Sequence, residues 1–380
     1  MNYKVAVVGG GGHIGLPLSC YIQNKNLETL IIDKNKEVLS KISNSTSPFK
    51  ELNLKENLIK AVGKGLKVSD KIEDVKNCNV IIVCLGTSSK NEDKDLFNDV
   101  IEDIFKYIGS NNLIILRSTI EKGLSESITK KYNLSAKNNL LAYCPERIAE
   151  GNAFEELEEL IQIVGTNSED EFVFFKKFFD AINIKTLNTN YAEAEFLKLF
   201  LNTYRYAQFS LINYFANISN MHSINFQQVL DIGKEEYPRL DGVPEPGLVG
   251  GPCLIKDSKT FVSSYDQNSE FMNQIFQLNE NYIQNILNEV ITKFTNKKII
   301  QLGITFKPNS DDLRDSQSMV LYKRLLDLNY SVKIVDPNIP EAQSYDQVKS
   351  FSDNILISTF HDEFKKIDFS NKEVIIVGKK

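Results

Sequence analysis

The 380-residue sequence is poor in cysteine. Five cysteines are few and odd in number for a chain of this length, and no two are spaced as Cys-x-x-Cys, which argues against a disulfide framework and a zinc site. They are Cys20, Cys78, Cys84, Cys144 and Cys253. The simplest interpretation of most of them is a small buried apolar residue in a reducing compartment.

Long apolar runs and an excess of basic residues are also lacking. No apolar run approaches the ~20 residues that a membrane-spanning helix needs. Residues 3–8 suggest a strand and show no signal-peptide pattern, so we expect a cytoplasmic protein with no membrane partner. The net charge of −6 argues against a nucleic-acid partner, because phosphate backbones select basic surfaces, although it leaves room for a local diphosphate pocket.

The order of apolar runs predicts the fold class. In the first ~180 residues, short β-branched runs alternate with helix-period segments, as in a parallel sheet with crossover helices. The expected strands there are 5–8, 29–32, 80–84, 113–117, 140–142 and 162–164. Helical spacing follows at 192–219 and 273–294, around a turn-rich segment at 237–257 of the kind that is usually functional.

The remaining residues read as a second, smaller α/β unit. Its expected elements are strands 299–302, 332–335, 355–358 and 374–377, with a helix near 318–328. We therefore predict an α/β protein with two Rossmann-like, doubly wound parallel-sheet domains joined by a central long-helix domain. The expected boundaries are 1–186, 187–296 and 297–380.

A glycine motif follows the first expected strand. Gly10, Gly12 and Gly15 form GxGxxG with His13 and Ile14, where glycines allow a tight turn and a pyrophosphate can meet a helix N-terminus.

An acidic residue, Asp33, ends the second strand at about the distance that a dinucleotide site requires. A carboxylate there binds a ribose 2′-hydroxyl and repels a 2′-phosphate, which favours NAD over NADP. A glycine-rich turn without ligand, and for Asp33 a plain strand-end residue, are the alternatives.

Reactive residue types gather in the middle of the chain. Cys253 follows Gly-Gly-Pro at an expected helix start, where the helix dipole and Lys256 favour the thiolate. Lys198 and Asn202 lie four residues apart and so share one face of the long helix. A buried structural cysteine and an exposed polar pair are the alternatives.

Three loops follow expected strands, at the sheet edge where parallel sheets bind ligands. They are Ser118-Thr119, the segment 144–151 with two carboxylates and an arginine, and the segment 306–315 with cations suited to a diphosphate. Each by itself could be an ordinary loop.

Together these segments resemble the UDP-glucose/GDP-mannose dehydrogenase family. The resemblance covers nearly the whole chain in order. It rests on GGGGHIGLPLS, RSTIEKG, CPERIAEG, EAEFLKLFLNTYR, PGLVGGPCLIKD and LGITFKPNSDDLRDS. It implies NAD-dependent oxidation of a nucleotide-sugar C6 alcohol to a carboxylate, through a thiohemiacetal and a thioester on a cysteine.

The resemblance also assigns catalytic roles. Cys253 matches the nucleophile, while Lys198 and Asn202 match the donors that stabilise the developing oxyanion. Asp257 matches the carboxylate that, with Lys198, handles a water or proton. Glu146 matches the acid/base of thioester hydrolysis.

Binding roles follow in the same way, and Thr119 also matches a hydroxyl near the catalytic water. The expected cofactor-binding residues are Gly10, Gly12, His13, Ile14, Gly15, Asp33, Thr87, Thr119 and Arg314. The expected substrate-binding residues are Glu146, Arg147, Ile148, Ala149, Glu150, Lys198, Asn202, Arg239, Gly251, Phe306 and Lys307. Arg239 resembles an arginine that reaches the neighbouring subunit's substrate, in keeping with a homodimer built on the long helix. No metal is expected.

Three departures from the family pattern stand out. Segment 85–88 lacks two usual prolines but keeps Thr87, and Glu121 stands where proline is common. The chain ends near Lys379, where relatives continue through an arginine-containing turn, so that one substrate contact is either missing or supplied by Lys379.

The substrate sugar is less defined than the reaction class. Pro238-Arg239-Leu240 with Gly-Gly-Pro-Cys resembles the branch acting on UDP-N-acetylmannosamine or UDP-N-acetylglucosamine. UDP-glucose ranks second, since the UDP-glucose branch more often has Phe at the position where this chain has Arg147. GDP-mannose ranks after it. A two-electron β-hydroxyacid-type dehydrogenase and a non-catalytic nucleotide-sugar binding protein also stay open.

Overall fold

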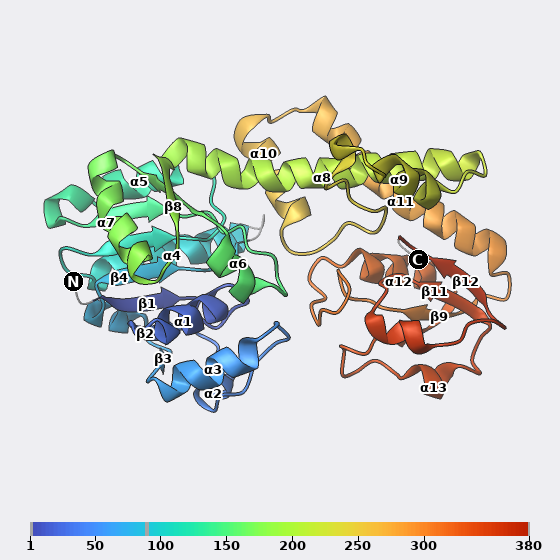
Figure 1. Cartoon of the computed structure of the whole chain (residues 1–380), viewed down its shortest axis with the longest axis horizontal. Coiled ribbons are helices and arrows are strands. Elements are labelled where there is room, and N and C mark those ends of the chain that lie inside the picture. The colour runs from blue at the N-terminus through green and yellow to red at the C-terminus, as the bar shows by residue number, and fades with distance from the viewer. Residues whose placement is uncertain (1–2, 88–90, 379–380) are drawn as a thin grey trace. The chain divides into compact units, whose positions relative to one another are not determined.

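The computed structural model describes residues 3–87 and 91–378. Its first sheet, sheet A, has the strand order β3-β2-β1-β4-β5-β6-β7-β8 (Figure 1). The strands are β1 (Lys4–Val8), β2 (Glu28–Ile32), β3 (Lys67–Ser69), β4 (Val80–Val83), β5 (Leu113–Leu116), β6 (Leu140–Tyr143), β7 (Gln162–Thr166) and β8 (Thr186–Asn190). The strand order reverses between β1 and β4, which is where doubly wound sheets bind ligands.

Helices cover both faces of sheet A. They are α1 (Gly15–Asn24), α2 (Lys36–Ser43), α3 (Leu54–Gly63), α4 (Asn91–Tyr107), α5 (Leu124–Lys131), α6 (Ala153–Glu159) and α7 (Glu169–Ala181). Helices α4 and α5 share one apolar core with alternate strand residues such as Ala6, and α1 and α7 share another with Val5 and Val7. Because successive strand residues enter opposite cores, the strands read as continuous apolar runs.

One prediction for sheet A needs correction. Strand β7 runs antiparallel to β6, with Tyr143 opposite Gly165, so the sheet is parallel except at this pair. The connection from β6 to β7 therefore starts and ends at the same sheet edge and makes no crossover. It keeps the loop after β6 at the carboxyl edge of the central strands. Strands β3 and β8 were not predicted, since both are short or polar in sequence.

The second half of the chain holds two long helices and a smaller sheet. The helices are α8 (Tyr191–Met221), α9 (Phe226–Lys234), α10 (Leu254–Tyr265), α11 (Glu270–Lys293), α12 (Gln317–Asp327) and α13 (Tyr345–Val348), with short 3-10 turns η3 (Pro238–Leu240) and η4 (Asp362–Lys366). Sheet B has the order β10-β9-β11-β12, all parallel. Its strands are β9 (Lys298–Leu302), β10 (Ser331–Val335), β11 (Asn354–Ile357) and β12 (Glu373–Ile376).

Sheet B is also covered on both faces. Apolar residues of α11 and α12 pack with Ile299 and Leu356, while Val348 of α13 and Phe364 of η4 pack on the other side with Ile300. The α/β fold with two mainly parallel sheets and long central helices is therefore confirmed. The strands and long helices predicted from the sequence are found within a few residues of their expected positions.

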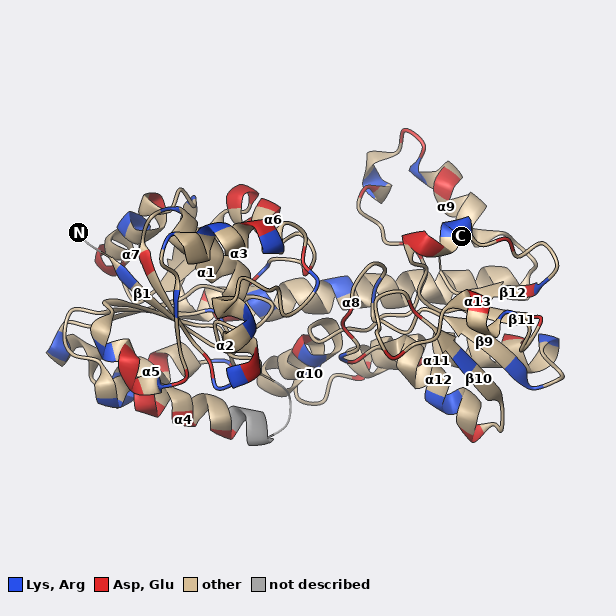
Figure 2. Cartoon of the chain, turned by 90° about the horizontal axis from the view of Figure 1, so that it is seen from below, with Lys and Arg blue, Asp and Glu red and all other residues tan. Residues whose placement is uncertain are grey.

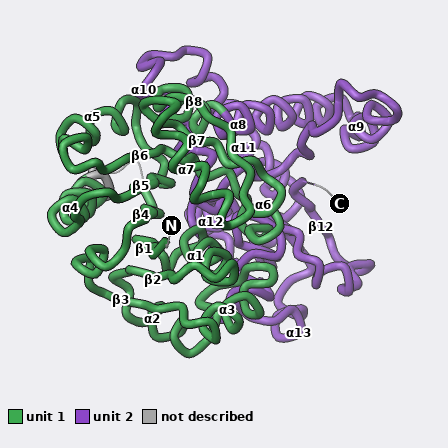
Figure 3. The backbone as a smooth tube through the Cα atoms, turned by 60° about the vertical axis from the view of Figure 1, so that its left-hand side comes forward, with its two compact units in different colours: residues 1–200 green, residues 201–380 purple. Residues whose placement is uncertain are grey.

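The chain forms two compact units, residues 1–200 and 201–380, coloured separately in Figure 3. The long helix α8 begins in the first unit and ends in the second. The predicted division into three domains, with boundaries near residues 186 and 296, stays a prediction. Within the described ranges, no helix is long and apolar enough to cross a membrane.

Candidate active site

The glycine-rich turn lies between β1 and α1, at the point where the strand order of sheet A reverses. A Cβ on Gly15 would lie 2.5 Å from the Gly9 carbonyl oxygen, and one on Gly10 would lie 2.7 Å from that of Val7. Gly12 has space around it, with its nearest neighbour 3.6 Å from such a Cβ. The turn therefore fits a pyrophosphate that approaches the backbone at the positive end of α1.

His13 and Ile14 complete this turn. Ile14 is the N-cap of α1 and makes no side-chain capping bond. The His13 ring stacks on Phe49 with centroids 4.1 Å apart, and its Nδ1 lies 3.9 Å from a carboxylate oxygen of Glu150. An expected cofactor-binding residue and an expected substrate-binding residue are thus neighbours.

Asp33 directly follows β2 and is half-buried beside the glycine turn. Its Oδ2 accepts the Gly11 N–H at 3.0 Å, and its Oδ1 accepts the Asn35 N–H at 3.0 Å. The carboxylate is therefore fixed next to the turn, where the ribose of a bound dinucleotide would lie.

Thr87 and Thr119 follow neighbouring strands, β4 and β5. The Thr87 hydroxyl donates to the Thr119 carbonyl oxygen at 2.9 Å. This bond ties the two loops together, although segment 85–88 lacks the prolines that are usual in the family.

A buried ion pair lies under the loop that follows β6. The Arg117 Nε donates to Glu146 Oε2 at 3.0 Å, Nη2 contacts the same oxygen, and Nη1 donates to Gln162 Oε1 at 2.6 Å. The other carboxylate oxygen of Glu146 accepts the N–H groups of Arg147 and Ile148, both at 2.8 Å. Both carboxylate oxygens of Glu146 are thus already hydrogen-bonded within the protein.

The environment of Glu146 favours its ionised form. Burial by itself raises the pKa of this carboxyl, but the charge and hydrogen bond of Arg117 and the Ile148 N–H outweigh burial and hold it below its ordinary value. A carboxylate held ionised in this way is a poor proton donor near neutral pH. The sequence did not identify Arg117 as functional, because its partner lies 29 residues away.

Two further glutamates hold the rest of this loop. Glu51 accepts the N–H groups of Gly151 at 2.7 Å and Ala153 at 3.0 Å, and Glu156 accepts the N–H of Ala149 at 2.6 Å. The backbone of the expected substrate loop is therefore fixed by carboxylates. Glu51 was missed by sequence reasoning, since it lies 100 residues from Gly151.

Two other expected substrate-binding residues of this loop, Arg147 and Glu150, have different neighbours. The Arg147 guanidinium contacts the backbone carbonyl of Ile161. Glu150 is directed toward His13.

Lys198 lies on α8 and is 7% exposed. Its Nζ donates to the backbone carbonyl oxygen of Glu146 at 2.8 Å. The ammonium is thus held beside the loop after β6, at the residue whose side chain pairs with Arg117.

Asn202, one turn further along α8, contacts a second carboxylate. Its Nδ2 donates to Asp257 Oδ2 at 2.6 Å, and Lys256 Nζ lies 3.3 Å from Asp257 Oδ1. Asp257 is fully buried in the first turn of α10. Its N–H donates to the carbonyl oxygen of Cys253 at 2.8 Å, so the carboxylate and the cysteine lie one helical turn apart.

Cys253 differs from the other cysteines. It is exposed and forms the N-cap of α10, as the sequence predicts. Burial raises the pKa of the other four thiols: Cys20, Cys84 and Cys144 to about 12 and Cys78 to about 11. Those four are protonated at neutral pH and are poor nucleophiles.

The segment before Cys253 is held by a buried amide. Asn213 of α8 is fully buried, and its side chain accepts the Gly247 N–H at 2.9 Å and donates to the Gly247 carbonyl oxygen at 2.9 Å. Asn279 of α11 continues this network to the Tyr206 hydroxyl at 3.2 Å. Sequence reasoning did not find this support for the cysteine loop.

The cysteine loop also packs on the loop after β9. The Gly251 N–H donates to the Asp315 carbonyl oxygen at 3.1 Å. A Cβ on Gly251, which has φ +90°, would lie 2.6 Å from the Phe306 ring. Two expected substrate residues, Gly251 and Phe306, are therefore in direct contact.

The cations of the second unit differ in their partners. Lys307 lies over the Phe306 ring at 5.6 Å. Arg314 pairs with Asp312 through Nε at 2.8 Å, and Arg239 lies over the Tyr237 ring at 5.4 Å on η3. Lys379 lies outside the described residues.

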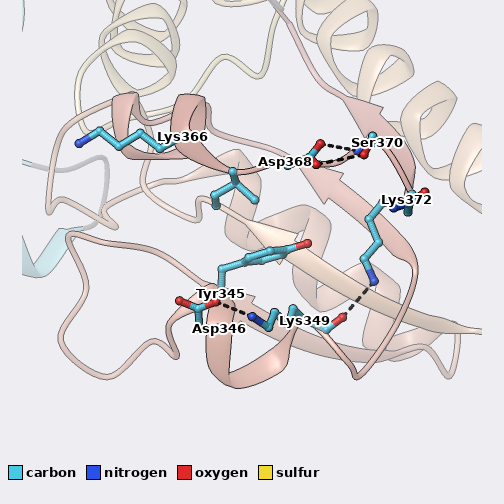
Figure 4. A pocket seen from close by; sticks show the side chains of 9 residues that line it. Tyr345, Asp346, Lys349, Lys366, Asp368, Ser370 and Lys372 are labelled. Carbon is cyan, nitrogen blue, oxygen red and sulfur yellow. Dashed lines mark hydrogen bonds and ion pairs between the residues drawn. The ribbon is translucent and has the colours of Figure 1, made fainter.

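A pocket of about 490 Å³ lies beside α13 and the segment before β12 (Figure 4). Two of its three lysines are paired: Lys349 with Asp346 at 2.9 Å and Lys372 with Asp353 at 2.6 Å. It lies where strands β11 and β12 start, so it is on the opposite edge of sheet B from the loop after β9. It does not coincide with any expected binding residue.

Three family models match the chain in order. They describe the NAD binding domain (residues 3–183), the central domain (192–281) and the UDP binding domain (301–379) of one family. The chain belongs to the UDP-glucose/GDP-mannose dehydrogenase family. It is an NAD-dependent nucleotide-sugar dehydrogenase, and the family resemblance and the cofactor predicted from the sequence are confirmed.

Individual relatives of this dehydrogenase cover nearly its whole length. A UDP-N-acetyl-D-mannosamine dehydrogenase of Methanocaldococcus jannaschii is 30% identical over 96% of this chain and 87% of its own. The structure of a UDP-N-acetylmannosamine dehydrogenase from Pyrococcus horikoshii is 26% identical with a TM-score of 0.90, covering 98% of this chain and 95% of its own. That of the UDP-N-acetylmannosamine dehydrogenase Cap5O from Staphylococcus aureus is 25% identical with a TM-score of 0.85, covering 98% and 94%.

Proposed function

We propose that this dehydrogenase oxidises the C6 primary alcohol of UDP-N-acetylmannosamine to the carboxylate and consumes two NAD⁺ in doing so. One observation carries the chemistry: the exposed Cys253 lies one helical turn from the buried Asp257, whose carboxylate accepts a hydrogen bond from Asn202. The sugar is proposed from the relatives, whose names specify UDP-N-acetylmannosamine. UDP-N-acetylglucosamine and UDP-glucose are the competing substrates.

Two oxidations at C6 and one hydrolysis make up the proposed reaction. NAD⁺, when bound, would supply the hydride acceptor for both oxidations. In the first oxidation the C6 alcohol also loses its hydroxyl proton, for which Asp257, through a water, is the proposed acceptor. The Cys253 thiolate adds to the aldehyde carbon, and the resulting C–S bond gives a thiohemiacetal, which loses the second hydride to become a thioester. Water then attacks the thioester carbon, the C–S bond breaks, and the carboxylate and the thiol are released.

Protein groups supply charge stabilisation and proton transfer. Lys198 and Asn202 lie one turn apart on α8, and each is a donor for the oxygen that gains negative charge. Asp257, held by Asn202, takes the proton of the attacking water. The Thr119 hydroxyl is the proposed neighbour of that water.

For Glu146 we propose a positioning role. Its carboxylate is bound by Arg117 and its carbonyl oxygen accepts Lys198 Nζ, so the residue holds the lysine in place. This differs from the acid/base role that the family resemblance implies, because the pKa of Glu146 is lowered. The remaining cofactor- and substrate-binding residues keep the roles predicted from the sequence as proposals, including Arg239 for the partner's substrate.

The reaction is tested by the ratio of NADH formed to sugar consumed across a panel of UDP- and GDP-sugars. We expect a ratio of two and the highest kcat/KM with UDP-N-acetylmannosamine. A ratio of one would instead indicate a two-electron dehydrogenase of the β-hydroxyacid type. No NADH with any sugar would leave only a binding role.

The nucleophile is tested by Cys253→Ser, with Cys78→Ser as the matched control. The variant should bind UDP-sugar and NAD⁺ as before but lose four-electron turnover by orders of magnitude, since serine is a far weaker nucleophile at neutral pH. The control should retain full turnover. Oxidation to the acid at the parent rate by Cys253→Ser would exclude the thioester route.

The role of Glu146 is tested by Glu146→Gln and intact-protein mass spectrometry during turnover. A positioning role predicts slower oxidation and no covalent adduct, because Lys198 is misplaced in every step. Accumulation of a substrate-mass adduct would restore the acid/base role in hydrolysis.

We also propose a homodimer built on α8. The second half of α8 carries no charged residue (Figure 2), and apolar side chains there are exposed at helical spacing. They are Leu211, Tyr214, Phe215, Ile218 and Met221. A continuous apolar surface of this kind marks an association surface.

Light scattering coupled to size-exclusion chromatography should give the mass of a dimer. Phe215→Asp should produce monomers, whereas Leu187→Asp, at a side chain on β8 that is at least as exposed, should not. Because NAD and nucleotide sugars are metabolites of the cytoplasm, a cytoplasmic location remains part of the proposal.

A further inference from the structure

His361 is fully buried at the carboxyl edge of sheet B, four residues after β11 ends. Its ring packs edge-on against Phe364 with centroids 5.3 Å apart. Neither the sequence motifs nor the proposed chemistry uses this residue. Its hydrogen bonds nevertheless lead into the loop after β9, which carries the expected substrate-binding residues Phe306 and Lys307.

The contacts of His361 define its tautomer. Nδ1 lies 2.9 Å from the backbone nitrogen of Asn309, and a backbone N–H can only donate, so Nδ1 must be the acceptor. Asn338 Nδ2 also approaches Nδ1, at 3.0 Å. The ring therefore has its proton on Nε2.

The other side of the ring agrees with this assignment. Nε2 lies 3.1 Å from Asp336 Oδ2 and 3.3 Å from the Thr305 hydroxyl oxygen. The single Thr305 hydroxyl proton is already donated to the Lys307 carbonyl oxygen at 2.9 Å, so toward His361 this oxygen accepts. One neutral imidazole thus donates toward Asp336 and Thr305 and accepts from Asn309.

These bonds hold the first half of the loop at three points. Asp336 Oδ2, the oxygen that faces His361, also accepts the Ile304 N–H at 2.8 Å. Asn309 is further fixed by two bonds with Asp362, at 2.7 and 3.1 Å. Phe306 and Lys307 lie between the held residues, so their backbone has little freedom to move.

We propose that His361 is a positioning residue for nucleotide binding: as the neutral, Nε2-protonated imidazole it holds the loop after β9 in the conformation that binds the diphosphate of the substrate. This inference rests on the proposed function, because it assumes that Phe306 and Lys307 contact the UDP group. The residue acts through the loop and does not touch substrate.

Two conservative substitutions separate the two sides of the ring. Asparagine places an amide oxygen near the position of Nδ1 and can still accept the Asn309 N–H. Glutamine places its amide near Nε2 and reaches Asp336 but leaves the Asn309 N–H without its acceptor. His361→Asn is therefore the rescuing variant and His361→Gln the damaging one.

The experiment is calorimetric titration of the full-length protein with UDP alone and, separately, with NAD⁺. We expect His361→Gln and His361→Ala to weaken UDP binding about tenfold, the size of one lost buried hydrogen bond, and His361→Asn to stay within about threefold of the parent. NAD⁺ affinity should not change. In turnover, KM for the UDP-sugar should rise while kcat is nearly constant.

Phe364→Leu is the matched control. It removes packing from the same ring and should lower the unfolding temperature without changing UDP affinity. If all three His361 variants bound UDP as the parent does, or if His361→Asn were as damaged as His361→Gln, the proposal would be overturned. If the parent protein bound no UDP, the proposed function itself would fail, and this inference with it.

A measurement on the parent protein covers the case of variants that do not fold. Long-range ¹H–¹⁵N spectra of histidine-labelled protein distinguish the two neutral tautomers, and the chain has only three histidines. We expect the buried histidine as the Nε2–H form. A Nδ1–H form would contradict the proposed bond from Asn309.

Discussion

The two sheets begin with the same construction but use it differently. After the first strand of each sheet comes a glycine with positive φ, Gly9 at +75° and Gly303 at +77°. Each donates its N–H at 2.8 Å to the carbonyl that ends the second strand, that of Ile32 or Val335. The next residue in each case is an aspartate that accepts a backbone N–H from the loop after the first strand.

The difference lies in what surrounds that aspartate. Asp33 is half-buried beside a short turn that leads directly into α1, whereas Asp336 is 3% exposed and contacts His361. In sheet A the helix start itself can meet a phosphate, and the carboxylate is near enough to contact a ribose. In sheet B the loop is longer, and the carboxylate supports that loop instead. The same residue type at the same strand end therefore does not imply the same role.

The largest expected effect concerns the strand-end glycine of sheet B. A Cβ on Gly303 would lie 2.0 Å from the Thr359 carbonyl oxygen, in addition to the strain of positive φ. Gly303→Ala should destabilise the second unit by about 4 kcal/mol or prevent its folding. Gly242→Ala, at φ +74° with no atom nearby, isolates the strain and should cost about 1 kcal/mol. Similar unfolding temperatures for the two variants would refute the steric part of this expectation.

The second effect concerns the buried carboxylate. Asp336→Asn removes the charge that faces His361 and replaces one of the two oxygens that accept the Ile304 and Asn338 N–H groups, Oδ2 and Oδ1 respectively. We expect a loss of about 2 kcal/mol in urea unfolding, because buried charged hydrogen bonds are costly to break. Asp33→Asn should change unfolding by less than about 0.5 kcal/mol, as is usual for a residue away from the core. Equal losses for the two would remove the distinction between the sheets.

The third effect concerns cofactor choice. Asp33→Asn removes the negative charge that repels a 2′-phosphate, so kcat/KM with NADP⁺ relative to NAD⁺ should rise about tenfold. Asp70→Asn, an exposed carboxylate after β3, serves as the control. An unchanged ratio would mean that Asp33 does not lie at the ribose.

The smallest effect is a pH dependence. Burial by itself raises the pKa of Asp336. The hydrogen bonds from His361 and from the Ile304 N–H lower this pKa by a larger amount, so the pKa of Asp336 is below its ordinary value. Its contribution to stability is therefore complete above the unfolded value of about 3.9 and is lost as the pH falls from there toward the folded value. The unfolding temperature of Asp336→Asn should decline less steeply below about pH 4 than that of the parent. Parallel declines would contradict the role given to this pair.

Local sequence patterns predicted most of the fold. Apolar runs located the buried strands, and residues 192–219 predicted nearly all of α8, because each pattern depends on near neighbours in the sequence. The polar strand Thr186–Asn190 was missed, since its partner β7 and not its own composition makes it a strand. The reversed direction of β7 was missed for the same reason.

The site was predicted less completely than the fold. Cys253, Lys198 and Asp33 stand in motifs whose chemistry is readable from spacing. Arg117 begins the motif RSTIEKG but received no role there, and His361 stands in no motif, because their roles depend on Glu146 and on Asp336, which are 29 and 25 residues away in the sequence. Buried hydrogen bonds between residues this far apart form only in the tertiary fold, so no local sequence pattern predicts them.

The contrast among the five thiols also has a practical consequence. Since only Cys253 is exposed and the other four are held as thiols by burial, a limiting amount of a mild alkylating reagent should label the protein at one position. With excess reagent, each folded molecule should take up one label, whereas an unfolded molecule exposes all five thiols, so that labelling above one per chain measures the unfolded fraction of a preparation. A fluorophore introduced in this way would report on substrate entry at the reacting atom itself.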